Sequence, residues 1–169
     1  MKRHSALTIV LLMTAALLSA CGFHLRGSTV HDSMPFKSIL VVVPDSSTLG
    51  IELKRHLRAG NDTIIAGNQK DAQVVMEVTS EKRSKSILSI NVQGRVREYT
   101  LNYQLRYRVR DAKNRELIKP TALVLKRTLI FSEAHALARE SEEELLYRDM
   151  QTDMVQQIMR RLAAMKIPV

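Results

Sequence analysis

Residues 99–109 read YTLNYQLRYRV and alternate strictly between apolar and polar side chains. Successive side chains of a β-strand point to opposite faces of the sheet, so this alternation predicts a strand with one buried face and one face in water. The buried face would carry six side chains: Tyr99, Leu101, Tyr103, Leu105, Tyr107 and Val109.

The segment before this strand predicts its antiparallel partner. Val74, Met76 and Val78 alternate with polar residues in the same way. Residues 87–92 are apolar enough to form another strand or the far end of the same hairpin arm. Residues 92–95 are typical of a turn, because they include a glycine among polar neighbours.

The segment after it predicts a third strand and a long helix. The strand is expected over 117–131, and Pro120 within it indicates an edge position or a bulge. From Ser132 the period changes to that of a helix, which Pro168 would end. The apolar stripe of this helix comprises Leu146, Met150, Met154, Ile158, Leu162 and Met165.

The first elements of the domain are a buried strand and a short helix. Residues 39–43 form an apolar run closed by Pro44, which predicts a strand covered on both faces. Several helix-capping residues follow at 45–48, and leucines recur at four-residue spacing until Gly60. These leucines are Leu49, Leu53 and Leu57.

Taken in order, the elements predict an α+β fold with the sequence β-α-β-β-β-α. We expect a two-layer sandwich in which a mostly antiparallel or mixed four-stranded sheet has two helices on one face.

The amino terminus resembles the signal of a bacterial lipoprotein. A cationic start, residues 1–4, precedes a thirteen-residue apolar segment, 6–18, that is too short to span a bilayer. Leu18-Ser19-Ala20-Cys21 then resembles a lipobox, and Cys21 is the only cysteine of the chain. The alternative is an ordinary signal peptide cut near a cysteine by chance.

The lipobox implies three segments. Residues 1–20 would be a lipoprotein signal peptide cleaved between Ala20 and Cys21, residues 21–36 a lipidated tether and residues 37–169 a single α+β domain. Diacylglyceryl and N-acyl chains on Cys21 would hold the protein at a membrane, because two or more chains give stable anchoring. Gly22 resembles the residue of lipoproteins that are passed to the cell outer membrane, with the domain in the periplasm.

The net charge and the absence of catalytic motifs restrict the class of function that we expect. The chain carries a formal net charge of +9, which favours an acidic partner. Nucleic acid is not expected for an exported lipoprotein, and anionic lipid, lipopolysaccharide or an acidic protein cavity remain. We expect no enzyme, no metal and no cofactor beyond the covalent lipid, because the sequence has no HExxH, no GxSxG and no phosphate-binding glycine loop.

Three arginines on the wet face of the 99–109 strand form a candidate anion site. Arg106, Arg108 and Arg110 follow one another at two-residue spacing, so neighbours would be about 7 Å apart. Their guanidinium groups suit phosphate. The alternative is a solvated sheet face whose charges discourage edge pairing.

Three short motifs remain: residues 21–27, CGFHLRG; Gly94 followed by Arg97-Glu98-Tyr99; and residues 136–139, ALAR. Together they resemble the LPS-assembly lipoprotein LptE (RlpB) family. The resemblance implies a protein that plugs an LptD-like outer-membrane β-barrel as a heterodimer, helps to assemble it and binds lipopolysaccharide during transport to the cell surface. Arg139 matches the basic position at the start of the last helix in that family.

The resemblance is incomplete at the turn. Val92 and Gln93 stand where more charge is expected, so Arg95, Arg97 and Arg139 are the better candidates for lipopolysaccharide binding. The alternative function is that of a periplasmic lipid or glycan carrier lipoprotein without a barrel partner. A cavity for acyl chains between helices and sheet would favour the carrier, and a filled core would favour the plug.

Overall fold

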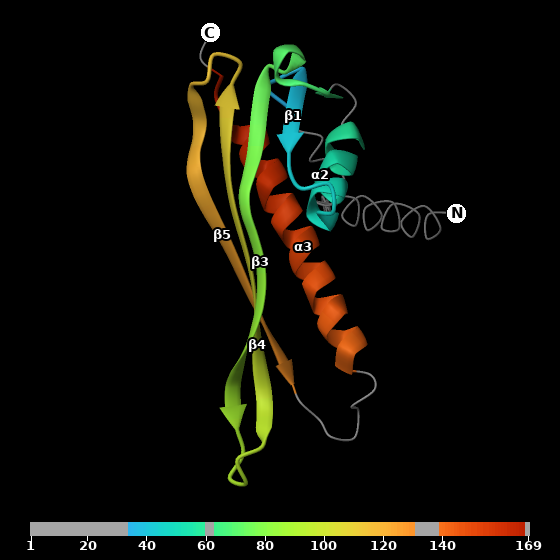
Figure 1. The fold of residues 1–169 in the computed structure, drawn as a ribbon, viewed down its shortest axis with the longest axis vertical. Helices are drawn as coiled ribbons and strands as arrows, with labels where there is room; N and C mark the ends of the chain where they lie inside the picture. The colour runs from blue at the N-terminus through green and yellow to red at the C-terminus, as the bar shows by residue number, and fades with distance from the viewer. Residues whose placement is uncertain (1–33, 60–62, 131–138, 168–169) are drawn as a thin grey trace, which may run out of the picture. The chain divides into compact units, whose positions relative to one another are not determined.

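The computed structural model describes residues 34–59, 63–130 and 139–167. The sheet is mixed and has five strands in the order β2-β1-β3-β4-β5, with β1 parallel to β2 and β3, and the other pairs antiparallel. Figure 1 shows the arrangement. The elements are β1 (Ser38–Val42), α2 (Thr48–Ala59), β2 (Ile64–Ile65), a 3₁₀ turn (Gln69–Asp71), β3 (Val74–Ile90), β4 (Val96–Asp111), β5 (Glu116–Ile130) and α3 (Arg139–Ala164).

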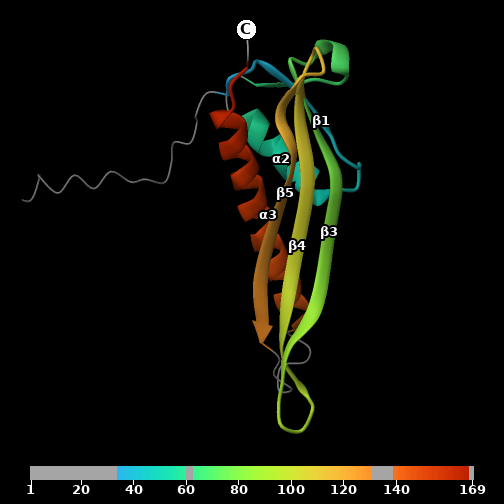
Figure 2. The ribbon, with the colours of Figure 1, turned by 90° about the vertical axis from the view of Figure 1, so that its left-hand side faces the viewer.

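Within the described residues, the two α-helices, α2 and α3, lie on one face of the sheet, as Figure 2 shows. The predicted α+β sandwich is therefore confirmed. The sheet has five strands in place of the expected four because β2 was not anticipated. That strand has only two residues, which pair with Ser38 and Ile39, and two residues are too few to produce an alternating pattern.

The alternating stretch is the centre of the core. Leu101, Tyr103, Leu105, Tyr107 and Val109 are all 0% exposed, and they face the two helices from the middle of β4. The leucines of α2 and the stripe of α3 pack against them, as the helical period predicts. The described side chains that complete this contact are Leu49, Leu53, Leu57, Met150, Met154, Val155, Ile158 and Leu162.

The start of α2 is fixed by a cap and a close packing contact. The backbone N–H of Gly50 donates to the Ser47 hydroxyl at 3.1 Å, so Ser47 is the capping residue among the candidates at 45–48. A Cβ at Gly50 would lie 2.4 Å from Cγ2 of Val43. The absence of a side chain therefore allows α2 to lie directly against the end of the β1 segment.

The prediction that β1 is covered on both faces is wrong. Ile39 and Val41 face the core, but Val42 is 44% exposed. Leu40 is half-buried against the small cluster of Ala66, Ala72 and Val75. The face of β1 that points away from the helices is therefore covered only in part, by this small cluster.

The longest strands form a hairpin. The predicted segment 87–92 begins as the far end of β3, which pairs with β4 as far as Ile90 opposite Val96. In Figure 1 this hairpin extends past the first turn of α3. β5 is an edge strand, and its register with β4 shifts between Ile118 and Thr121, so the position and irregularity indicated by Pro120 are confirmed.

Candidate functional site

The three arginines of β4 lie on the sheet face away from the helices, but the protein supplies its own anion to two of them. Glu77 stands directly opposite Arg108 in the register of β3 and β4. Its Oε2 lies 2.6 Å from Nη2 of Arg108 and 3.3 Å from Nη2 of Arg110. The repulsion within the row is therefore compensated locally.

Arg106 differs from its two neighbours. Its side chain is exposed, and it makes no hydrogen bond or ion pair with any described residue. Arg110 is also bonded to Asn114, while its Nε is buried without a partner among the described residues. Arg106 is thus the member of the row that is open to an external anion.

A second basic group lies at the far end of the hairpin. The turn between β3 and β4 is closed by the Asn91 side chain, whose Oδ1 accepts from the backbone N–H of Gln93 and of Arg95. Gly94 has a φ of 78°, a conformation that glycine adopts without strain. This turn holds Arg95 and the start of β4 so that Arg95 and Arg97 are both exposed.

Large exposed apolar side chains lie at the same end of the sheet as this basic group. Ile87, Leu88 and Ile90 are between 53% and 60% exposed, and Val92 at the turn is 97% exposed. Ile130, at the end of β5 and opposite Glu98, is 68% exposed. Exposed apolar residues gathered at one end of a domain mark a contact with lipid or protein.

The two basic groups are separate. Arg97 and Arg108 are eleven residues apart on one strand, which corresponds to about 36 Å. Arg139 is the first residue of α3, and its side chain lies outside the described part of the structure. Ala20 and Cys21 also lie outside the described residues, so the predicted lipidation site is not placed.

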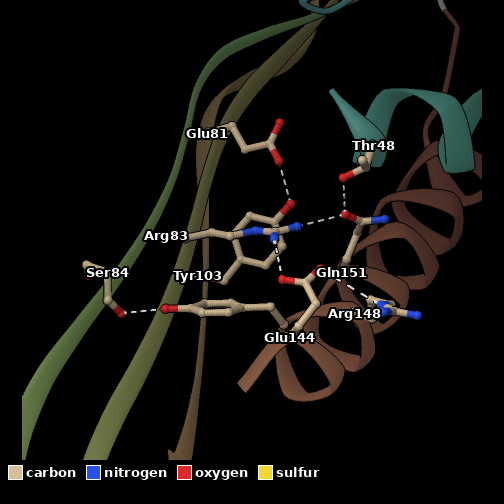
Figure 3. A network of polar contacts seen from close by, with 9 residues as sticks. Thr48, Glu81, Arg83, Ser84, Tyr103, Glu144, Arg148 and Gln151 are labelled. Carbon is tan, nitrogen blue, oxygen red and sulfur yellow. Dashed lines mark hydrogen bonds and ion pairs between the residues drawn. The ribbon is translucent and has the colours of Figure 1, made fainter. Parts of the chain in front are cut away.

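Between the layers, a polar network joins α2, β3, β4 and α3, as Figure 3 shows. The Glu81 carboxylate accepts from the Tyr103 hydroxyl at 2.5 Å and from the Ser47 hydroxyl at 2.8 Å. Arg83 donates to Oε1 of Gln151, which also accepts from the Thr48 hydroxyl. The network therefore ties the start of α2 to the middle of α3 through β3.

Two tyrosine rings pack against Arg83 in this network, and the network raises the pKa of one of them. The Arg83 guanidinium lies 5.0 Å from the ring centre of Tyr103 and 5.2 Å from that of Tyr147, within range of cation–π attraction. Burial raises the pKa of Tyr103, and the adjacent Glu81 carboxylate raises it further. The Tyr103 hydroxyl is therefore a persistent donor, which gives the network a structural role.

A hollow of about 360 Å³ beside this network is lined by Pro44, Ser46, Ser47, Thr48, Glu81 and Arg83. Five of these six residues are polar or charged, and such a lining does not suit acyl chains. Within the described ranges, no group of histidine, cysteine or acidic side chains could hold a metal ion. The described helices include none that is both long and apolar enough to cross a membrane.

Sequence reasoning missed two features of these surfaces. The compensation by Glu77 depends on the strand register, which pairs residues 31 positions apart in the chain. The apolar character of the hairpin end was visible as the run 87–92, but a run of this kind is more often buried. The apolar side chains of residues 87–92 are exposed because the hairpin of β3 and β4 extends beyond the helices.

Comparisons with known proteins agree with this fold. Residues 36–162 match the protein-family model LptE, described as lipopolysaccharide-assembly. The chain is 26% identical over 163 residues to the LPS-assembly lipoprotein LptE of Pectobacterium atrosepticum, covering 95% of this chain and 86% of the relative. The protein of that name from Photorhabdus laumondii is 25% identical over 162 residues, with the same two coverages.

Solved structures resemble it as well. Lipoprotein B from Nitrosomonas europaea has a TM-score of 0.72 at 36% identity and covers 85% of this chain and 91% of its own. The rare lipoprotein B from Shewanella oneidensis, at 23% identity, shares the fold with a TM-score of 0.66 over 75% of this chain and 94% of its own. The relatives are named as lipoproteins and not as enzymes. The chain belongs to the LptE family of lipopolysaccharide-assembly lipoproteins.

Proposed function

We propose that this protein is an outer-membrane lipoprotein that plugs an LptD-like β-barrel, helps to assemble it and binds lipopolysaccharide during transport to the cell surface. The proposal combines family membership with the chemistry of the hairpin end. It requires no catalytic step, only binding and positioning.

The side chains at the hairpin end are the main support for lipopolysaccharide binding. Lipopolysaccharide combines phosphate groups with acyl chains. Arg95 and Arg97 offer guanidinium groups for phosphate, and Ile90 and Val92 offer exposed apolar surface beside them. We place Arg139 in the same proposed site and assign Arg106 a secondary role. Arg108 and Arg110 contribute less because Glu77 already neutralises part of their charge.

The test is charge reversal at the hairpin end. Arg95→Glu with Arg97→Glu should lower lipopolysaccharide binding by the detergent-solubilised lipoprotein at least tenfold at low salt, a loss of about 1.4 kcal/mol or more. The control is Arg55→Glu with Arg58→Glu, which makes the same charge change on exposed positions of α2. Equal binding by both double variants and the wild type would rule out this site.

The lipid anchor is tested separately. Mass spectrometry of the mature protein should find Cys21 as the first residue, carrying a diacylglyceryl group on sulfur and an acyl group on nitrogen. Cys21→Ser should abolish both the modification and the retention at the outer membrane, because no other strong anchor is proposed. An unmodified mature amino terminus would contradict the anchor.

The filled core supports a plug over a lipid carrier. The side chains between helices and sheet, Tyr103, Tyr107 and Met154 among them, are 0% exposed. The hollow beside Glu81 has charged residues in its lining and is small compared with what several acyl chains require. We therefore place lipopolysaccharide on the surface of the domain and not between its layers.

A further inference from the structure

The chain enters the described domain at the end of the sheet opposite the hairpin end. Met34 is the first described residue, and β1 begins at Ser38, beside the start of β3. The turn between β4 and β5 lies at this same end, because Val74 at the start of β3 pairs with Asp111 at the end of β4. Figure 1 shows these segments together. β4 has 16 residues, so about 50 Å separate this end from the hairpin turn.

Three segments form what we call the entry end: Lys37, the 3₁₀ turn 69–71 and the β4–β5 turn 111–116. Gln73 joins them, since its Oε1 accepts from the backbone N–H of Lys37 at 2.7 Å and its carbonyl oxygen accepts from the N–H of Ala112 at 3.1 Å. The Ser38 hydroxyl donates to the carbonyl oxygen of Asp71 at 2.9 Å. The entry end is therefore one ordered surface and not three independent loops.

The entry end carries more positive than negative charge. Each segment contributes one exposed lysine, and none of the three forms an ion pair with the part of the chain that the structure describes; they are Lys37, Lys70 and Lys113. The acid of the β4–β5 turn, Asp111, is 5% exposed, and its Oδ2 lies 2.6 Å from Nε of Arg115. Asp71 and Glu116 are exposed acids. Asp111 is thus neutralised internally, while the lysines are open to an external anion.

Both helices end near the entry end and add to its charge. Figure 1 shows the carboxyl end of α3 on this side, and α2 leads into β2, which pairs with Ser38. Residues 53–59 and 154–167 include no acid. The exposed cations there include Arg58, Arg160, Arg161 and Lys166. Cations at a helix carboxyl end are ordinary partners of the helix dipole, but the three lysines of the entry end lie outside both helices and have no such explanation.

The length of chain before the domain indicates a membrane as the partner. Thirteen residue steps lead from Cys21 to Met34, so an acylated Cys21 holds the start of the domain at most about 45 Å from the bilayer. An anionic surface attracts basic groups within about one Debye length, which is about 10 Å at 0.1 M salt, and the anchor brings the lysines near that range. A second copy of the chain would bring lysines against lysines, which disfavours a dimer through this surface.

We propose that the entry end rests on the headgroups of anionic phospholipids in the leaflet that holds the acyl chains of Cys21. This inference rests on the lipid anchor of the proposed function. Lys37, Lys70 and Lys113 meet the phosphate groups, and this contact adds an electrostatic attachment to the hydrophobic one. The contact orients the domain, because the lysines face the bilayer and the hairpin end, about 50 Å away, points away from it.

The test uses the full-length lipoprotein, acylated and purified from its membrane, in nanodiscs whose lipids carry a nitroxide on the headgroup. Ala112→Cys provides an exposed labelling site, since acylation would block Cys21. At about 0.1 M salt, a fluorophore on this cysteine should be quenched about threefold more in phosphatidylglycerol nanodiscs than in phosphatidylcholine nanodiscs. The difference should vanish at about 1 M salt, where the Debye length is about 3 Å.

Charge reversal tests the lysines themselves. Lys37→Glu with Lys70→Glu should lower the quenching in phosphatidylglycerol to the level seen in phosphatidylcholine. The control is Lys82→Glu with Lys126→Glu, the same charge change at exposed positions of β3 and β5 that lie about 24 Å or more from the entry end along β4. The control should leave the quenching unchanged. Thermal melting should be the same for all variants, because the substituted side chains are exposed.

The outcomes separate this inference from the proposed anchor. Equal quenching in the two lipids, or in the two double variants, overturns the inference while the anchor stands. Stronger quenching of a fluorophore on Gln93→Cys than on Ala112→Cys also overturns it, because the hairpin end would then face the bilayer. Quenching that requires added lipopolysaccharide and is absent with phosphatidylglycerol would assign the surface to lipopolysaccharide instead. If Cys21 is unmodified and the protein does not stay in the nanodiscs, the anchor fails and the inference fails with it.

Discussion

Tyr103 shows how one side chain links the core to a partly buried carboxylate. Its ring is fully buried, while its hydroxyl donates to Glu81 at 2.5 Å. Removing that donor leaves the carboxylate with the Ser47 hydroxyl as its other partner. The cost of under-satisfying a partly buried charged acceptor is about 1–3 kcal/mol.

We therefore predict that Tyr103→Phe lowers the free energy of unfolding by about 1–3 kcal/mol in urea titrations. Tyr107→Phe is the matched control, because Tyr107 is equally buried and its hydroxyl has only a 3.5 Å contact with Arg161. Tyr107→Phe should lower the free energy of unfolding by less than Tyr103→Phe does. Equal losses in the two variants would contradict the role of the Glu81 contact.

The same tyrosine predicts a pH dependence. Burial, followed by Glu81, raises the pKa of Tyr103 above the ordinary 10.0 that it regains on unfolding. As pH rises above 10.0, the unfolded chain loses this proton first, so the folded state is progressively destabilised. Measured in urea titrations, the free energies of unfolding of wild type and Tyr103→Phe should therefore approach each other as the pH rises across this range. A difference that stays constant with pH would argue against the raised pKa.

Glu77 controls the charge of the arginine row. Glu77→Gln removes the anion shared by Arg108 and Arg110, so we predict that the affinity for inorganic polyphosphate at low salt rises about two- to fivefold. Glu142→Gln makes the same charge change on an exposed position of α3 and is the control. Identical titrations for the two variants would show that the row does not bind external anions.

At the scale of elements, the position of α2 depends on the missing side chain of Gly50. Gly50→Ala would place a Cβ 2.4 Å from Cγ2 of Val43, so either the Val43 side chain or α2 must shift, and we predict a loss of about 1–3 kcal/mol in the free energy of unfolding. Gly67→Ala meets nothing within 4 Å and is the control. Chemical denaturation measures both. An unchanged free energy of unfolding for Gly50→Ala would contradict the tight contact between Gly50 and Val43.

Elements were predictable where one pattern determined them. The alternation over 99–109 identified β4 and its buried face, because burial of one face requires a period of two. The two-residue strand β2 has no such pattern, since it exists only through pairing with β1. The partial cover of β1 by Ala66, Ala72 and Val75 likewise depends on tertiary packing.

The candidate sites were less predictable than the core. The arginine spacing placed Arg106, Arg108 and Arg110 on one wet face, but the register that brings Glu77 against two of them cannot be read from local spacing. The exposure of Val92 follows from the length of the hairpin beyond α3, which is a property of the assembled fold.

At the scale of the whole molecule, the described domain has a filled core and an exposed hairpin end. The hairpin end combines exposed apolar residues with Arg95 and Arg97. Under the proposed function, this end contacts lipopolysaccharide, and the lipid on Cys21 would keep it at the outer membrane.

The most direct test of the central claim is native mass spectrometry of the tagged, full-length protein extracted from its own envelope in detergent. The proposed function predicts a one-to-one complex with a large outer-membrane β-barrel, and an acylated Cys21 in the lipoprotein subunit. Recovery of the protein alone with lipid bound would contradict the plug and favour the carrier.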